Sequence, residues 1–160
     1  SIGVTKVKEH GGLKAAYEEA RQYDDIVIAE QFIGGGEYTC AIIDGKAYPT
    51  IKIEPATEFY DYEAKYAPGG SVHVLPAVLP PAVFEAALRQ AEAAHVAMGC
   101  KGVSRSDFRY DDVKDDLVLL EVNTQPGMTP TSLVPEQAAF AGMGYKDLVR
   151  WMVEDASCPR

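Results

Sequence analysis

The sequence predicts an α+β fold built on a mainly antiparallel sheet, and three observations carry this prediction. Asp44-Gly45 separates two strand-like runs and is a strong signal for a β-hairpin. A second strand-like pair flanks the acidic segment 111–116 in the same way. Between the two pairs, residues 81–98 place apolar side chains on one face of a long helix. Strands that follow each other through short turns pair antiparallel, so we expect helices to cover such a sheet.

The first half of the chain predicts one helix, a buried strand and the first hairpin. The expected elements are a helix from 13 to about 23, a strand over 26–29, a glycine turn at 34–36, strands over 37–43 and 47–53, and a long loop from 54 to 71. The strand at 26–29 is predicted because a short apolar run lies between turn signals. The loop is predicted because turn-forming residues are frequent there and no period is visible.

The second half predicts the long helix, the second strand pair and two short helices. The expected elements are a strand over 73–76, a helix over 81–98, strands over 102–110 and 117–123, a loop over 124–134, and helices over 135–141 and 145–154. The apolar run 117–120 is expected to lie in the core. Neither a repeat nor a linker divides the chain, so residues 1–160 are expected to form one unit.

Composition excludes several classes of function. Fifteen basic and 24 acidic residues give a net charge of −9, which argues against a nucleic-acid partner and against an anionic membrane partner. No apolar run approaches the roughly 20 residues that a membrane-spanning helix needs. Cys40, Cys100 and Cys158 are isolated and show no metal-ligand spacing, so we expect a reducing, cytoplasmic location rather than a disulfide scaffold or a zinc site.

The second strand pair carries the residues best suited to chemistry. Arg105, Asp107 and Arg109 alternate along one strand and therefore share a face. Glu121 and Asn123 alternate in the same way on the neighbouring strand. Carboxylate and amide oxygens are hard ligands that suit Mg²⁺, and an arginine beside them can hold a phosphoryl oxygen. From the spacing alone, an exposed polar sheet face is an equally good interpretation.

A nucleotide, if bound, needs an unusual cradle, because the sequence contains neither the GxxxxGK[ST] phosphate loop nor a GxGxxG fingerprint. Six segments nevertheless occur in the order seen in D-alanine–D-alanine ligases of the ATP-grasp superfamily. They are 30–33 (EQFI), 59–66 (FYDYEAKY), 99–102 (GCKG), 105–107 (RSD), 120–129 (LEVNTQPGMT) and 132–135 (SLVP). The sequence resembles the C-terminal part of such an enzyme over nearly all of its length.

The resemblance implies an ATP-grasp fold and a position within the longer enzyme. Residues 1–4 resemble the end of that family's phosphate loop. The chain is therefore expected to begin inside this loop, to lack the N-terminal substrate domain, and to be inactive as a 160-residue fragment.

The resemblance also implies a metal site and an oxyanion site. Asp107, Glu121 and Asn123 would bind two Mg²⁺ ions, with Mn²⁺ as an alternative, that bridge the phosphates of ATP. Arg105 and the backbone N–H of Gly127 would stabilise the oxyanion of a tetrahedral intermediate.

Substrate roles follow from the same resemblance. Lys65 would contact the γ-phosphate, and Tyr66 would orient the first D-alanine. Ser132 and the N–H of Leu133 would hold the carboxylate of the second D-alanine, although Ser132 is also placed to cap the helix that follows it.

The adenine site is implied by residues on either side of the glycine turn. Glu30, Gln31 and Ile33 would line the slot for adenine, largely through backbone groups, and Glu37 would bond the ribose hydroxyls. Gln31 stands where the family often has lysine, which changes one side chain near adenine.

The implied activity is the ATP-dependent joining of two D-alanines through an acyl phosphate, for peptidoglycan precursor synthesis. The implied partners are small molecules, ATP and D-alanine, and a second subunit in a homodimer of the full-length enzyme. Two alternatives remain open at this point: a D-alanine–D-lactate ligase and a non-catalytic module that binds nucleotide or metal and regulates a partner.

Overall fold

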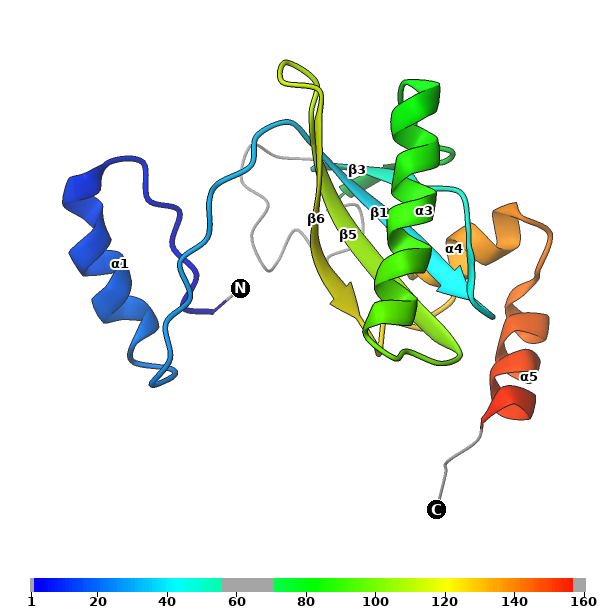
Figure 1. Cartoon of the computed structure of the whole chain (residues 1–160). Helices are drawn as coiled ribbons and strands as arrows, with labels where there is room; N and C mark the ends of the chain where they lie inside the picture. Colours follow the sequence, from blue (N-terminus) through cyan, green and yellow to red (C-terminus); the bar gives the residue numbers. More distant parts are fainter. Residues whose placement is uncertain (1, 56–70, 157–160) are drawn as a thin grey trace.

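An antiparallel sheet forms the centre of the computed structural model, which describes residues 2–55 and 71–156 (Figure 1). Its strands within these ranges are β1 (Gly36–Ile43), β2 (Lys46–Ala47), β3 (Ile51–Pro55), β4 (Ser71–Val74), β5 (Val103–Asp111) and β6 (Asp116–Asn123). The strand order is β4-β3-β1-β5-β6, and β2 pairs with β1. Every one of these pairs is antiparallel, so the predicted sheet type is confirmed.

The helices within the described ranges are α1 (Leu13–Ala20), which follows the 3-10 turn η1 (His10–Gly12), α3 (Pro81–Ala97), α4 (Leu133–Phe140) and α5 (Tyr145–Asp155). Helices α3, α4 and α5 cover the two faces of the sheet, and α1 lies apart from it (Figure 1). The predicted helices at 13, 81 and 145 are confirmed. Helix α4 begins two residues earlier than predicted, since Pro135 is tolerated within the first turn of a helix, where no intrahelical N–H bond is lost.

Strand β1 runs through the middle of the sheet and pairs with β5 along its whole length, from Gly36 opposite Tyr110 to Ile43 opposite Val103. The predicted hairpin after β1 is confirmed. Asp44 and Gly45 both have positive φ, 53° and 70°, as a two-residue turn of this kind requires.

The predicted single strand over 47–53 is divided into β2 and β3. Between them the ladder to β1 is interrupted, because the N–H of Ala41 donates to Oε1 of the buried Gln137 at 2.7 Å. The carbonyl of Ala41 instead accepts the N–H of Tyr48 at 2.8 Å. A helix side chain thus replaces one strand contact, which no local sequence pattern signals.

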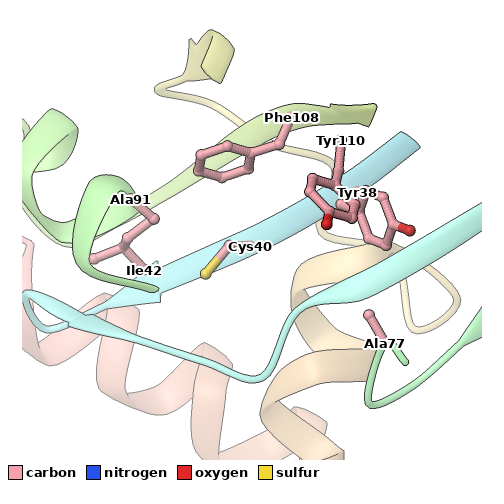
Figure 2. Packing of buried hydrophobic residues seen from close by; sticks show 7 residues of the cluster. All are labelled: Tyr38, Cys40, Ile42, Ala77, Ala91, Phe108 and Tyr110. Carbon is pink, nitrogen blue, oxygen red and sulfur yellow. The ribbon is translucent and has the colours of Figure 1, made fainter. Parts of the chain in front are cut away.

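Two apolar cores lie on opposite faces of the sheet. One packs beneath α3 and is built on buried residues that include Cys40, Ile42 and Phe108 (Figure 2). The other packs beneath α4 and α5, around Ile43 and Leu148. Alternate residues of β1, such as Ile42 and Ile43, therefore pack into different cores. On β5, Phe108 packs into the α3 core and Val103 into the other.

A β-bulge in β6 decides which of its side chains reach the α3 core. Phe108 pairs with Leu119, whereas the preceding residue of β5, Asp107, pairs with Glu121, so Leu120 is the extra residue. Leu119 consequently packs against the α3 core while Leu120 is 48% exposed. The prediction that the whole run 117–120 is core is wrong at Leu120.

The predicted strand over 26–29 is also wrong. This segment has no strand structure, and Ile26 and Ile28 are 78% and 79% exposed. The Asp24 carboxylate accepts the N–H of Ile26 at 2.8 Å, which makes a local turn. Apolar composition favours a strand only where a neighbouring strand supplies hydrogen bonds, and within the described part of the chain none pairs with this segment.

No helix among the described residues is long and apolar enough to cross a membrane.

Candidate functional site

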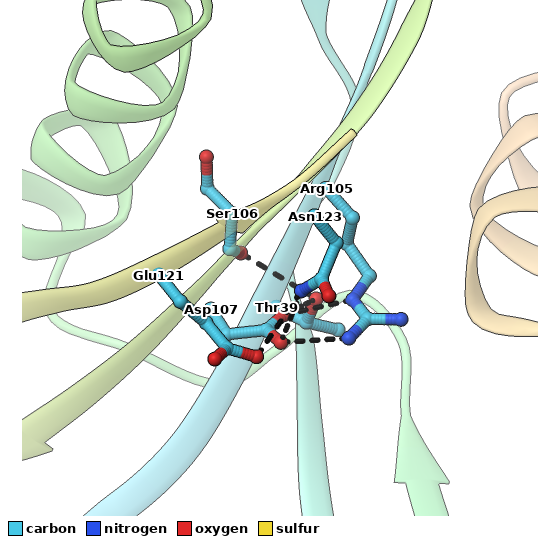
Figure 3. A network of polar contacts seen from close by, with 6 residues as sticks. All are labelled: Thr39, Arg105, Ser106, Asp107, Glu121 and Asn123. Carbon is cyan, nitrogen blue, oxygen red and sulfur yellow. Dashed lines mark hydrogen bonds and ion pairs between the residues drawn. The ribbon is translucent and has the colours of Figure 1, made fainter. Parts of the chain in front are cut away.

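The polar face predicted on β5 and β6 is formed in the structure, on the side of the sheet opposite α3 (Figure 3). Asp107 lies directly across from Glu121, and Arg105 lies directly across from Asn123. The bulge at Leu120 makes this possible, because without it Glu121 would share the α3 face with Leu119. The four side chains predicted from alternation therefore occupy one small area.

Asp107 is the centre of this polar cluster. Its Oδ1 accepts hydrogen bonds from the Thr39 hydroxyl at 2.6 Å and from Arg105 Nε at 2.8 Å. Its Oδ2 accepts from a second Arg105 nitrogen at 2.7 Å and from Asn123 Nδ2 at 3.0 Å. A carboxylate offers about four acceptor positions, so the protein already occupies all of them.

Asn123 links the two carboxylates. Its Nδ2 donates to Asp107 and, at 3.2 Å, to Oε1 of Glu121, which is exposed. Among the described residues no group of three or more histidine, cysteine, aspartate or glutamate side chains could hold a metal ion. The oxygen set available here is instead two carboxylates and one amide, which fits a hard cation such as Mg²⁺ that keeps several waters.

Arg105 has to move if Asp107 is to coordinate a cation. The guanidinium forms a bidentate pair with Asp107, and both side chains are largely covered, at 20% and 16% exposure. A cation that took over one Asp107 oxygen would release the guanidinium toward a substrate anion on the same face. Among the described residues, Arg105 is thus the positive charge that neutralises Asp107.

On the same face of the sheet, Arg109 of β5 contacts both β1 and the segment that precedes β1. Arg109 pairs with Glu37 at 3.5 Å, and Arg109 Nε donates to the carbonyl of Ile33 at 3.3 Å. The guanidinium also lies 5.9 Å from the centre of the Phe32 ring. Two of the residues predicted around adenine, Ile33 and Glu37, are therefore linked through Arg109. Glu30 and Gln31 are exposed, and within the described ranges no hydrogen bond or ion pair joins them to this group.

The loop between β6 and α4 brings Gly127 and Ser132 together. A Cβ added at Gly127 would lie 3.0 Å from the Ser132 hydroxyl oxygen, so a side chain there would press against Ser132. The Tyr145 hydroxyl donates to the carbonyl of Met128 at 2.8 Å and fastens this loop to the start of α5. Two groups predicted to meet substrate are thus held side by side by a helix that sequence analysis did not connect with the site.

Ser132 stands at the N-cap position of α4 but does not cap the helix. Its Oγ accepts the N–H of Thr129 at 3.1 Å and contacts the Thr129 hydroxyl at 2.8 Å. The alternative role of Ser132 as a side-chain cap is therefore wrong. The start of α4 therefore has no side-chain cap from Ser132, and uncapped N–H groups at a helix N-terminus are of the kind that binds anions.

Lys65 and Tyr66 lie outside the described residues. Their roles at the γ-phosphate and at the first D-alanine remain predictions.

Thr39 and Tyr145 belong to the site but were not predicted. Thr39 is buried and bonds Asp107, and its position two residues after Glu37 on β1 is the signal that could have found it. Tyr145 gives no such signal, since its contact with Met128 depends on how α5 packs.

The fold is the ATP-grasp fold, and one face of its sheet carries two carboxylates, an amide and an arginine close together. Residues 1–154 match the family model described as "D-ala D-ala ligase C-terminus". The chain belongs to this family.

Curated D-alanine–D-alanine ligases from other bacteria are similar to this chain over about half of their own length. The chain is 58% identical over 148 residues to D-alanine–D-alanine ligase B of Chromobacterium violaceum, covering 92% of this chain and 48% of the relative. It is 53% identical over 167 residues to D-alanine–D-alanine ligase of Methylobacterium radiotolerans, covering 100% of this chain and 54% of the relative. The chain spans about half the length of the curated relatives it matches.

Solved structures give the same result. D-alanine–D-alanine ligase from Bacillus anthracis complexed with ATP superposes with a TM-score of 0.78 at 35% identity, covering 93% of this chain and 48% of that one. The VanG D-Ala:D-Ser ligase from Enterococcus faecalis superposes with a TM-score of 0.81 at 32% identity, covering 95% and 45%.

Proposed function

We propose that this chain is the C-terminal ATP-grasp portion, residues 1–160, of a D-alanine–D-alanine ligase that works in the cytoplasm. The whole enzyme would join two D-alanines at the expense of ATP, through an acyl phosphate, to supply a peptidoglycan precursor. The observation that carries the proposal is the convergence of Arg105, Asp107, Glu121 and Asn123 on one open face. Family membership supports the same activity.

Asp107, Glu121 and Asn123 would hold Mg²⁺ at the phosphates of ATP. When bound, the cation would neutralise the charge of the transferred phosphoryl group. Asp107 needs only to give up part of its pairing with Arg105 to take part, since the two groups already lie in contact. Glu121 is exposed and is the carboxylate most accessible to an incoming ion.

Arg105 would then bind the developing negative charge of the reaction. It would hold oxygens of the acyl phosphate and, with the N–H of Gly127, the oxyanion that forms when the second amine attacks. Thr39 would keep Asp107 in place during this exchange through its 2.6 Å bond.

Ser132 and the N–H of Leu133 would hold the carboxylate of the second D-alanine. Support comes from the start of α4, where the helix has no side-chain cap and where Ser132 lies against Gly127. This arrangement would put the amine of the second substrate near the oxyanion groups.

Lys65 would contact the γ-phosphate, and Tyr66 would orient the first D-alanine. The nucleoside would be bound by residues on either side of the glycine turn: Glu30, Gln31, Ile33 and Glu37.

The acceptor substrate deserves its own test. The most similar curated relatives named above are D-alanine–D-alanine ligases, so a D-lactate acceptor is not favoured. The likeness to a D-Ala:D-Ser ligase makes D-serine the useful comparison.

We further expect the full-length enzyme to be a homodimer. Analytical ultracentrifugation of the full-length protein would measure its oligomeric state.

The deciding experiment uses the full-length protein with ATP, Mg²⁺ and D-alanine. We expect phosphate release that requires D-alanine and matches the amount of dipeptide formed, with D-serine and D-lactate as weaker acceptors. Glu121→Gln should abolish most of this turnover, and Asp116→Asn, at the exposed beginning of the same strand, should leave it unchanged. Hydrolysis of ATP that is independent of D-alanine would contradict the proposal and favour the regulatory module.

A further inference from the structure

A histidine on the sheet edge is bound to a glutamate on α4, outside the polar cluster described above. His73 lies on β4, and its Nδ1 is 2.6 Å from Oε2 of Glu136. The carboxylate can only accept, so Nδ1 carries the proton. Nε2 of the same ring lies 3.2 Å from the Ser71 hydroxyl. Both partners are partly covered, with 24% of the His73 side chain and 35% of the Glu136 side chain exposed.

Glu136 lies one helical turn after Ser132, the residue at the N-cap of α4. Its N–H donates to the carbonyl of Ser132 at 3.0 Å, so the two residues lie on the same side of the helix. Helical side chains lean toward the N-terminus and cover the turn before their own Cα. The Glu136 side chain is therefore placed near the first turn of α4, where Ser132 provides no side-chain cap.

The His73–Glu136 pair and the loop before Ser132 line the same hollow. Its volume is about 500 Å³, and its walls include Pro130 and Thr131 as well as Tyr145. The pair thus faces the space beside the start of α4, on the side of the loop that leads to Ser132.

A carboxylate in this position would compete with any anion at the start of the helix. The partial positive charge of the helix N-terminus attracts Glu136 as well as a substrate carboxylate, and two carboxylates close together repel each other. The proton on Nδ1 holds Glu136 toward β4 and satisfies one of its oxygens. An unbound Glu136 would be able to turn back toward the N–H of Leu133.

We infer that His73 is a positioning residue for the acceptor site: it restrains the Glu136 carboxylate and so keeps the start of α4 available for the carboxylate of the second amino acid. This inference rests on the proposed function and names the part of the site that sets affinity for the acceptor. It assigns no step of the chemistry to His73.

The test is a double-mutant cycle in the full-length enzyme. We expect His73→Ala to raise the KM for the second D-alanine about five- to tenfold, which corresponds to roughly 1 kcal/mol of competing helix-terminus interaction. The KM for ATP and kcat at saturating D-alanine should remain within twofold. His73→Ala combined with Glu136→Ala should return the KM to near its wild-type value, because the competing carboxylate is gone.

The matched control is Arg150→Ala, which removes the basic partner of Asp147 in the first turn of α5. It should change neither KM, and melting temperatures should show that every variant is folded. An unchanged KM in His73→Ala, or an increase that Glu136→Ala does not reverse, would overturn the inference while leaving the ligase activity established. Absence of ligation by the wild-type enzyme would instead refute the proposed function and the inference with it.

Discussion

At Asp107 a single carboxylate accepts hydrogen bonds from three side chains on three strands, Thr39, Arg105 and Asn123. Arg105 supplies two of the four donors in a bidentate arrangement that lysine cannot reproduce. The geometry of this face therefore depends on the guanidinium as well as on its charge.

Replacement of Arg105 is expected to reduce turnover without preventing folding. In the full-length enzyme, Arg105→Ala should lower kcat about 10²- to 10³-fold, as the loss of one oxyanion-stabilising donor does, and Arg105→Lys should recover only part of it. Steady-state phosphate release measures both. Arg89→Ala removes an exposed arginine from α3, on the other face of the sheet, and should behave as wild type. Equal kcat values for Arg105→Ala and Arg89→Ala would contradict the role given to Arg105.

Cys40 is expected to be unreactive although it lies one residue from Thr39. Burial raises the pKa of its thiol to about 12, and its side chain is fully buried. Because the thiolate is the nucleophile, alkylation at pH 8 should modify the partly exposed Cys100 and leave Cys40 intact until the protein is unfolded. Mass spectrometry of tryptic peptides would show the difference. Labelling of Cys40 at the rate of Cys100 under native conditions would mean that the sheet opens readily.

Among the elements, the turn before β1 depends on a glycine. Gly35 has a φ of +80°, and a Cβ added there would lie 1.9 Å from the carbonyl oxygen of Tyr110. The turn into β1 therefore approaches the end of β5 more closely than any other residue type permits.

Gly35→Ala should destabilise the protein by at least about 2 kcal/mol, through both the clash and the left-handed backbone. Gly45→Ala, with φ +70° but open space around it, should cost about 1 kcal/mol, and Gly11→Ala should be close to neutral. Denaturant unfolding of the three variants would rank them. A Gly35→Ala variant as stable as Gly11→Ala would disprove the close approach.

The bulge in β6 makes two adjacent leucines very different. Leu119→Ala should cost about 2 kcal/mol because it opens a space in the α3 core, whereas Leu120→Thr should change the unfolding free energy by less than about 0.5 kcal/mol. The same unfolding measurement compares them. If the order were reversed, Leu120 would be the inward residue and Glu121 would no longer face Asp107.

On the scale of the whole molecule, the N-terminal segment stands apart from the sheet (Figure 1). Helix α1 has no buried residue, and Ile26 and Ile28 in the segment that follows it are largely exposed. Short helices are marginal in water without tertiary packing.

Hydrogen exchange should reveal this division. In the 160-residue chain, backbone amides from Leu13 to Ile33 should exchange orders of magnitude faster than those in the centres of β1 and β5. Mass spectrometry of peptide fragments gives the rates. Comparable protection in both regions would show that the N-terminal segment packs more firmly than its exposure indicates.

Local periodicity predicted the parts of the fold and site that depend on neighbouring residues. Alternation along β5 correctly grouped Arg105 with Asp107, and the Asp44-Gly45 turn gave the first hairpin. The insertion of Leu120 was invisible, because an apolar residue within an apolar run looks like core. The hydrogen bonds between Gln137 and Ala41 and between Tyr145 and Met128 depend on how the helices pack. No local pattern of residues in the sequence predicts such long-range contacts.

The satisfied carboxylate of Asp107 has a consequence for how the protein is made. Where a fold needs its metal to neutralise ligands, chelation unfolds the protein and synthesis must wait for the ion. Here Arg105 and Asn123 already satisfy Asp107, so we expect the sheet to form without any metal ion. If the proposed Mg²⁺ site is correct, loading would be a late and reversible step, and EDTA should stop catalysis by the full-length enzyme while leaving its melting temperature almost unchanged.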